Sequence, residues 1–366
     1  MAGRRARRLA AVLSALLASV VVGWATEQEP GPDDAYRRLV ARYRSGDTEA
    51  ARDLAEAVNA GRLPRGPCPG RAECEATAVL NLDAAAWLLG ATRGDRAEDL
   101  VAATRPLVSR QSATFAFDWL LAAGSLHQRY ANHARGFELY ASALELRPGD
   151  PLALLARATA LEFSVMPDGF GAVVVADRDV WRLLQPGGEP PAELAFKLAN
   201  PRTETPYRRL LLEFLTRQYR DILEVDPALA EARLRLGRVL EARGHRAEAE
   251  IDLRAVAASR EDPYLAAIAQ LCLARLEPSP EGAATAYRSA LKADPSLSPA
   301  WLGLSQSLHA TGDREEALDA LERALALGET RSLSAWIEYH LGRGRAFPDA
   351  LEALRARLTP SSASPR

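Results

Sequence analysis

Residues that could carry out chemistry are scattered through this sequence of 366 residues rather than gathered in motifs. No two histidines have the spacing that a helical metal site requires. The sequence also lacks a His-Glu-x-x-His motif, a nucleophile elbow, a phosphate-binding loop and a dinucleotide fingerprint. The five histidines are His127, His133, His245, His309 and His340. We therefore expect a protein with no catalytic residue, no metal ion and no cofactor.

Four of the carboxylates within residues 165–206 are the exception. Asp168, Asp177, Asp179 and Glu189 lie in a stretch that is rich in proline and glycine. Carboxylates can act as general acid and base, but only where the fold makes them converge on a substrate. An enzyme with its site on this stretch therefore stays open as an alternative function.

The three cysteines predict a small disulfide ring and a buried thiol. Cys68 and Cys74 lie in a loop rich in proline and glycine, and in an exported protein they can form a disulfide; the alternative is that both stay reduced. Two thiols without a nearby histidine cannot fill a tetrahedral zinc site. We expect Cys272, which lies in a helical stretch, to be a small buried apolar residue.

The first 25 residues have the composition of a secretory signal peptide. Four arginines precede an uncharged apolar run over residues 9–22, and small residues at 23 and 25 suit cleavage after Ala25. We therefore expect an exported protein, periplasmic or secreted. The alternative is a chain anchored in the inner membrane by residues 9–24.

The charge of the exported chain gives no reason to expect a nucleic acid partner. Removing residues 1–25 takes away four arginines and no acidic residue, so the formal net charge changes from −2 to −6. Binding of nucleic acid requires a basic patch or stripe.

A period of 34 residues organises the second half of the sequence. Each period contains two amphipathic helical segments around a polar turn with glycine, as at Gly244 and Gly312. Two short helices joined by so brief a turn must lie antiparallel, and small residues let them approach closely. Three columns repeat at this spacing: Ala249, Ala283 and Ala317; Leu253, Tyr287 and Leu321; and Val256, Ala290 and Ala324.

The motifs within this period resemble tetratricopeptide repeats. The segments that carry the resemblance are WLGL at 301–304, LGRVL at 236–240, AATAYRSALKADP at 283–295 and ELYASALELRP at 138–148. The sequence departs from the family pattern where Gln270-Leu271 replaces Leu-Gly and where Glu329 replaces the final proline. The resemblance implies an all-α fold, a right-handed α-solenoid of stacked antiparallel helix pairs. It also implies a scaffold that binds a protein or peptide along the first helices of the pairs.

The repeat register predicts the organisation of the rest of the chain. The expected parts are a signal peptide at 1–25, degenerate hairpins with the cysteine loop at 26–115, repeats at 116–227 with an insert at 165–206, three well-matched repeats at 228–329, a capping hairpin at 330–358 and a disordered tail at 359–366.

Positions four and then three residues apart on the first helices share one face and predict a groove. The expected groove residues are Leu234, Arg235, Arg238, Glu241, Ile268, Arg275, Leu302, Gln306 and His309. The leucines and the isoleucine would form an apolar floor that suits an extended peptide or a helix. The alternative is that these three residues only pack between repeats. In the first hairpin, Tyr36, Arg37 and Arg44 would extend the same face.

We therefore expect a non-catalytic scaffold of the bacterial cell envelope that binds a protein partner. A carbohydrate-binding scaffold for envelope polysaccharide export is the alternative, and exposed aromatic side chains along the groove would favour it. Self-association is also compatible with the sequence.

Overall fold

The computed structural model describes residues 32–62, 68, 70–130, 132–162, 206–328 and 346–358. Within these ranges the chain forms 15 helices and no strand. The predicted signal peptide, most of the insert, the first part of the capping hairpin and the C-terminal tail lie outside the described residues. The described helices form an α-solenoid of antiparallel helix pairs, and they fall into two compact units.

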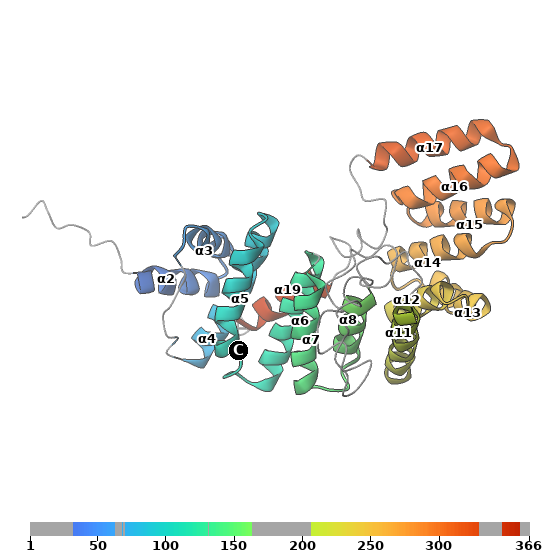
Figure 1. Cartoon of the computed structure of the whole chain (residues 1–366). Helices are drawn as coiled ribbons and strands as arrows, with labels where there is room; N and C mark the ends of the chain where they lie inside the picture. The colour runs from blue at the N-terminus through green and yellow to red at the C-terminus, as the bar shows by residue number, and fades with distance from the viewer. Residues whose placement is uncertain are drawn as a thin grey trace, which may run out of the picture. The chain divides into compact units, whose positions relative to one another are not determined.

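The first unit contains two helix pairs (Figure 1). Its helices are α2 (Pro32–Arg44), α3 (Glu49–Asn59), α4 (Arg71–Gly90) and α5 (Gly94–Val108). Helix α4 contacts the other three and is buried on most sides, including its polar residues Asn81 and Asp83. Tyr36 donates a hydrogen bond to Asn81 (2.7 Å) and Tyr43 donates one to Asp83 (3.0 Å). These bonds satisfy polar groups that would otherwise be costly to bury.

The second unit contains the longer stack. Its helices are α6 (Ala113–Arg129), α7 (His133–Leu146), α8 (Pro151–Glu162), α11 (Pro206–Val225), α12 (Ala230–Ala242), α13 (Arg246–Ala257), α14 (Pro263–Leu276), α15 (Pro280–Ala293), α16 (Ser298–Thr311) and α17 (Arg314–Gly328), with most of α19 (Ala346–Leu358). From α6 to α17 each helix packs against the next described helix. One continuous apolar core runs through the stack from α7 to α17.

Small residues set the distance between the helices of the α6–α7 and α12–α13 pairs. A Cβ atom on Gly124 would lie 2.5 Å from Tyr140, and one on Gly237 would lie 2.8 Å from Leu253. In both pairs the large residue follows its glycine by 16 positions, so the same contact recurs in two repeats. The repeated small residues are therefore packing positions, as the sequence pattern predicts.

Glycine also ends several first helices. Gly312 has φ 90°, a left-handed conformation that side chains other than glycine adopt at a cost. The backbone N–H of Asp313 then donates to the carbonyl of Leu308 (3.0 Å), which closes the end of α16 before α17 begins. Gly46 and Gly244 occupy equivalent turns with φ 94° and 81°.

No helix in the described residues has both the length and the apolar character needed to cross a membrane.

Candidate partner-binding surface

The predicted groove residues lie on α12, α14 and α16, the first helices of three successive pairs. These helices contact one another across the stack, α12 with α14 and α14 with α16. The structure therefore brings the three helix faces together, but it divides the predicted residues into a buried and an exposed set.

The apolar floor of the predicted groove is mostly part of the core. Leu234 and Ile268 are fully buried, and Cys272 is 1% exposed. Leu302 alone among the three floor positions is half-buried and still reaches the surface. The prediction that Leu234 and Ile268 line a groove is therefore wrong. Both residues pack between helices, because neighbouring helices cover the faces on which they lie.

The prediction that Arg235 and Arg238 lie in an open groove is also wrong, because both are buried in a cluster of charged groups. Glu162, at the end of α8, is 2% exposed and accepts hydrogen bonds from both arginines. The Arg235 Nη1–Glu162 Oε2 distance is 3.1 Å, and the Arg238 Nη1–Glu162 Oε1 distance is 2.9 Å. Arg235 also donates through Nε to Glu231 at 2.8 Å.

Tyr219 of α11 completes this cluster by donating its hydroxyl proton to Glu162 Oε2. Burial, and then the negative charge of Glu162, raise the pKa of Tyr219 well above its usual value, so the hydroxyl stays protonated. Burial disfavours the guanidinium charge of Arg235, but the Glu162 and Glu231 carboxylates outweigh this effect and raise its pKa. Arg235 therefore keeps its positive charge within the cluster, and Tyr219 stays neutral.

The buried cluster of Glu162, Tyr219, Arg235 and Arg238 connects three helices. It joins α8 to α11 and α12, although α8 and α11 are separated in sequence by residues 163–205. Because all its members are buried, the cluster positions helices and does not offer an open binding surface.

The set that reaches the surface consists of the exposed residues Arg275, Gln306 and His309 and the half-buried residues Glu241 and Leu302. Arg275 donates through Nη2 to Glu241 Oε1 at 2.9 Å, and this pair links equivalent positions one period of 34 residues apart. Gln306 and His309 are exposed on α16, near the half-buried Leu302. This surface combines the apolar side chain of Leu302 with the polar side chains of Gln306 and His309, beside the ion pair of Arg275 and Glu241.

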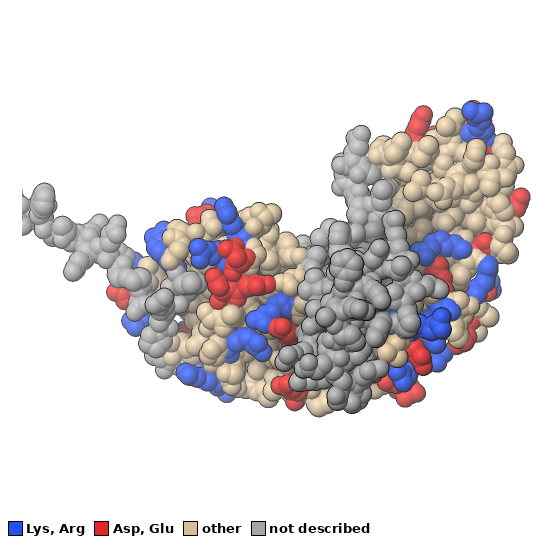
Figure 2. Space-filling model, in the orientation of Figure 1, with Lys and Arg blue, Asp and Glu red and all other residues tan. Residues whose placement is uncertain are grey.

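The first helices of the last two described pairs carry very few charges. Helix α16 contains no Asp, Glu, Lys or Arg, and α14 contains Arg275 alone. Figure 2 likewise shows few charged side chains on the visible surface of the part that contains α14 to α17. The second helices α15 and α17 differ, since both carry acidic and basic residues.

A pocket of about 480 Å³ lies between α15, α16 and α17, at a place that the sequence does not predict. Leu291, Pro295, Trp301, Leu304 and Ala320 form its apolar lining. Trp301 also has a structural role, since its indole N–H donates to the carbonyl of Pro295 (2.9 Å). The pocket has no local sequence signal, because three helices must come together to form it.

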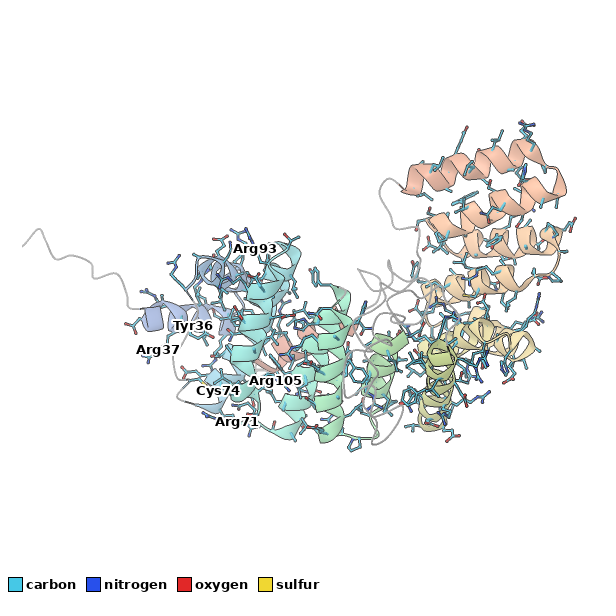
Figure 3. The ribbon with its side chains drawn as sticks, in the orientation of Figure 1. Tyr36, Arg37, Arg71, Cys74, Arg93 and Arg105 are labelled. Atoms are coloured by element: carbon cyan, nitrogen blue, oxygen red, sulfur yellow. A yellow bond between two sulfur atoms is a disulfide. The ribbon has the colours of Figure 1, made fainter. Side chains whose placement is uncertain are left out.

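In the first unit, Tyr36 does not belong to the predicted extension of the groove face. Tyr36 is 8% exposed and holds Asn81 in the interior, so it does not lie on an open face. Arg37 and Arg44 are exposed. Figure 3 shows Tyr36 and Arg37 on α2, with Arg71, Cys74, Arg93 and Arg105 elsewhere in this unit.

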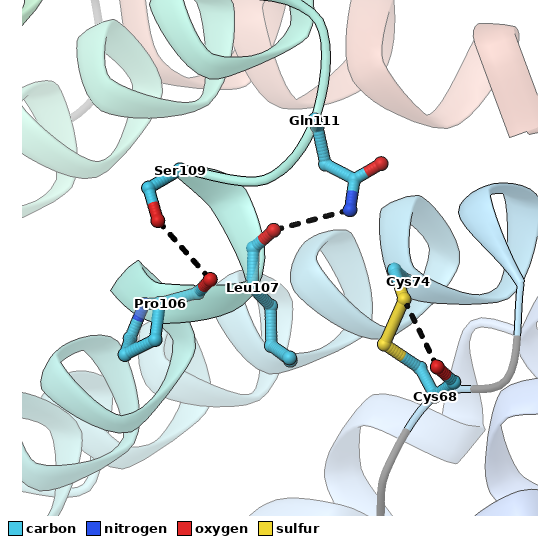
Figure 4. The surroundings of a disulfide bond; sticks show 6 residues. All are labelled: Cys68, Cys74, Pro106, Leu107, Ser109 and Gln111. Atoms are coloured by element: carbon cyan, nitrogen blue, oxygen red, sulfur yellow. Dashed lines mark hydrogen bonds between the residues drawn. A yellow bond between two sulfur atoms is a disulfide. The ribbon is translucent and has the colours of Figure 1, made fainter.

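Cys68 and Cys74 form a disulfide bond (Figure 4). The bond ties the loop that precedes α4 to the first turn of this helix, where the Cys74 N–H donates to the carbonyl of Gly70 (2.9 Å). Cys272 is a buried thiol outside this disulfide, as the sequence predicts. Among the described residues, no three His, Cys, Asp or Glu side chains gather as metal ligands do.

The fold and these contacts define a helical-repeat scaffold. Residues 277–334 match the model of the tetratricopeptide repeat family, in agreement with the resemblance seen in the sequence. No curated protein matches the sequence.

Solved structures with a similar chain path have low sequence identity to this chain. MamA is 17% identical, with 57% of this chain and 95% of that chain covered and a TM-score of 0.36. YrrB, described as a TPR protein with an unusual peptide-binding site, is 15% identical, with 62% and 96% covered and a TM-score of 0.36. The human IFIT1 dimer with PPP-AAAA is 15% identical, with 84% and 71% covered and a TM-score of 0.38.

Proposed function

We propose that this protein is a non-catalytic scaffold that holds a segment of a partner protein on the exposed face of α12, α14 and α16. The face that we propose for binding consists of Glu241, Arg275, Leu302, Gln306 and His309, and is called the first-helix face below. Tetratricopeptide repeats are typical of protein–protein interaction, which supports the general assignment. The particular face is our inference from the exposure and chemistry of these residues.

The observation that carries this proposal is the scarcity of charge on α14 and α16. The one Asp, Glu, Lys or Arg on these two helices, Arg275, is already paired with Glu241. A partner segment therefore does not need a compensating charge to bind here. Leu302 can contact an apolar side chain of the segment, and the Gln306 amide can both donate to and accept from its main chain.

We also propose that the protein works in the bacterial cell envelope, in the periplasm or outside the cell. The disulfide between Cys68 and Cys74 supports this location, because such bonds persist in oxidising compartments. The apolar segment at residues 9–22 with its preceding arginines supports export, with anchoring to the inner membrane as the alternative outcome.

A protein segment suits the described surface better than a carbohydrate does. Binding of sugars by a scaffold would favour a row of exposed aromatic rings. The exposed aromatic side chains among the described residues are Trp87 and Tyr130, which lie in different units. Trp301 is half-buried, and the Cζ atom of Arg323 lies 4.8 Å from its ring centroid.

The test compares binding by two surface variants with binding by a matched control. The full chain is used to capture partners from envelope extract of its own source, and each recovered protein is quantified by mass spectrometry. Leu302→Asp and Gln306→Arg place charge on the first-helix face and should lower recovery of the specific partner about tenfold. Arg260→Glu changes the charge of an exposed loop residue away from this face and should leave recovery unchanged. Equal recovery by all variants would exclude this face as the binding site.

A further inference from the structure

The pocket between α15, α16 and α17 has the form of a preorganised site for one apolar side chain. Its volume of about 480 Å³ lies within the roughly 300–1,000 Å³ range of ligand pockets. Leu291, Leu304 and Ala320 are buried at its floor, and the half-buried ring of Trp301 forms part of the wall.

The wall is held in place before any partner arrives. The indole N–H of Trp301 is bonded to the Pro295 carbonyl at 2.9 Å, and the guanidinium of Arg323 lies over the ring. Arg288 of α15 and Glu316 of α17 form an ion pair at 2.7 Å that bridges the two second helices. A site that is already ordered loses less conformational entropy on binding.

The charges that line the pocket are unequal. Three basic residues, Arg288, Lys292 and Arg323, face two acidic residues, Glu316 and Asp319. Arg288 is paired with Glu316, and Arg323 is paired with Asp319 at 3.1 Å. Lys292 is exposed, and it forms no ion pair with any residue that the structure describes.

The paired arginine at the rim is also available to a partner. The Arg323 and Asp319 side chains are 55% and 58% exposed, and an exposed pair of this kind contributes little to stability because water screens it. A carboxylate from a partner can therefore replace Asp319 at little cost. With the ammonium of Lys292, this gives two positive groups beside an apolar hollow.

From this arrangement we propose that α15, α16 and α17 form a second docking surface, which binds an acidic peptide segment of a partner protein. One aliphatic side chain of the segment enters the hollow against Trp301, while neighbouring carboxylates contact Lys292 and Arg323. This surface is separate from the first-helix face, so the chain can hold two partner segments at once.

The probe for this surface is the fluorescein-labelled peptide Gly-Glu-Glu-Leu-Glu-Gly, whose binding to the full chain is measured by fluorescence anisotropy at low salt. Two control peptides carry glutamine in place of every glutamate or serine in place of leucine. We expect each control peptide to bind at least about fivefold more weakly than the probe, and the probe to weaken as salt screens the charges. Equal binding of the glutamine peptide, or no measurable binding of the probe, would overturn the proposal.

Protein variants locate the site. Lys292→Glu reverses an exposed charge and should weaken binding of the probe peptide at least about fivefold. Arg260→Glu is a matched charge reversal in the loop before α14 and should change the affinity for the probe less than about twofold. Trp301→Leu should also weaken the probe, with circular dichroism used to show that the helices are retained. Unchanged affinity of Lys292→Glu would refute the proposed site.

Two further results distinguish peptide binding at this pocket from self-association and from binding at the first-helix face. If the pocket instead binds a second copy of the chain, analytical ultracentrifugation will show a dimer that Lys292→Glu dissociates, and this outcome would overturn the peptide proposal. Capture through the first-helix face should be unaffected by Lys292→Glu. The experiments therefore distinguish failure of the proposed peptide site on α15, α16 and α17 from failure of the proposed binding on the first-helix face.

Discussion

Removing the charge of Glu162 should destabilise the second unit more than any surface substitution does. The Glu162→Gln variant keeps the shape of the side chain but leaves the buried guanidinium groups of Arg235 and Arg238 without their shared carboxylate. Arg235 keeps its bond to Glu231 in this variant. Breaking a buried ion pair by removing one partner costs about 3–5 kcal/mol.

The helices that lose stability in Glu162→Gln are as informative as the total loss in the free energy of unfolding. Repeat stacks are stabilised by nearest-neighbour contacts, so they do not always unfold in one step. Native-state hydrogen exchange should show faster exchange in α8, α11 and α12, which the cluster joins, while α16 and α17 change little. Urea denaturation followed by circular dichroism gives the overall loss in the free energy of unfolding.

Two further variants control this experiment. Glu250→Gln removes the carboxylate of an exposed pair with Arg254 (2.6 Å) and should cost no more than about 0.5 kcal/mol. The double variant Glu162→Gln, Arg238→Gln removes two of the three buried charges, leaves Arg235 paired with Glu231, and should recover part of the loss in the free energy of unfolding. A cost below about 1 kcal/mol for Glu162→Gln, or a loss that the double variant only increases, would refute the assignment of a buried and coupled cluster.

Three other perturbations test the packing, the buried histidine and the disulfide. Gly303→Ala would place a Cβ atom against the ring of Tyr287, closer than any normal carbon contact, and should cost about 1–3 kcal/mol in urea denaturation; a cost near zero would contradict the close packing. Burial, and then the charge of Arg135, lower the pKa of His127 to about 4 from 6.5. The unfolded state therefore binds more protons between these pH values, and the free energy of unfolding should fall by up to about 3 kcal/mol as the pH drops from about 6.5 to about 4. His127→Leu should reduce this pH dependence, and an unchanged pH profile would contradict the assignment. Reduction of the Cys68–Cys74 bond should destabilise the first unit by about 2 kcal/mol, measured as a lower melting temperature with reductant, and Cys74→Ser should abolish that effect of reductant.

The fold could be predicted because its packing contacts recur at fixed spacing. Helix pairs favour small residues where the helices cross, and three of the turns place glycine at positive φ (Gly46, Gly244 and Gly312), so the sequence shows a period of 34 with glycine at several breaks. These requirements are local and repeat along the chain. They therefore leave a signal that a single sequence can show.

The partner-binding residues were less predictable because exposure depends on distant parts of the chain. Arg238 has the position of a groove residue on its helix, but its partner Glu162 lies 76 residues earlier. Nothing near Arg238 in the sequence indicates that the arginine is buried. Charge reversal at Arg238 would therefore test folding, whereas Leu302 and Gln306 offer side chains that can be changed at the surface.

Site-specific photo-cross-linking tests the central claim most directly. A photoreactive amino acid replaces Gln306 on the first-helix face, and in the control it replaces Arg260 in the loop between α13 and α14. After illumination in envelope extract, our account predicts that one partner protein cross-links to position 306 and not to position 260, and that Leu302→Asp abolishes the cross-link. The same products from both positions, or a cross-link that Leu302→Asp leaves intact, would contradict the account.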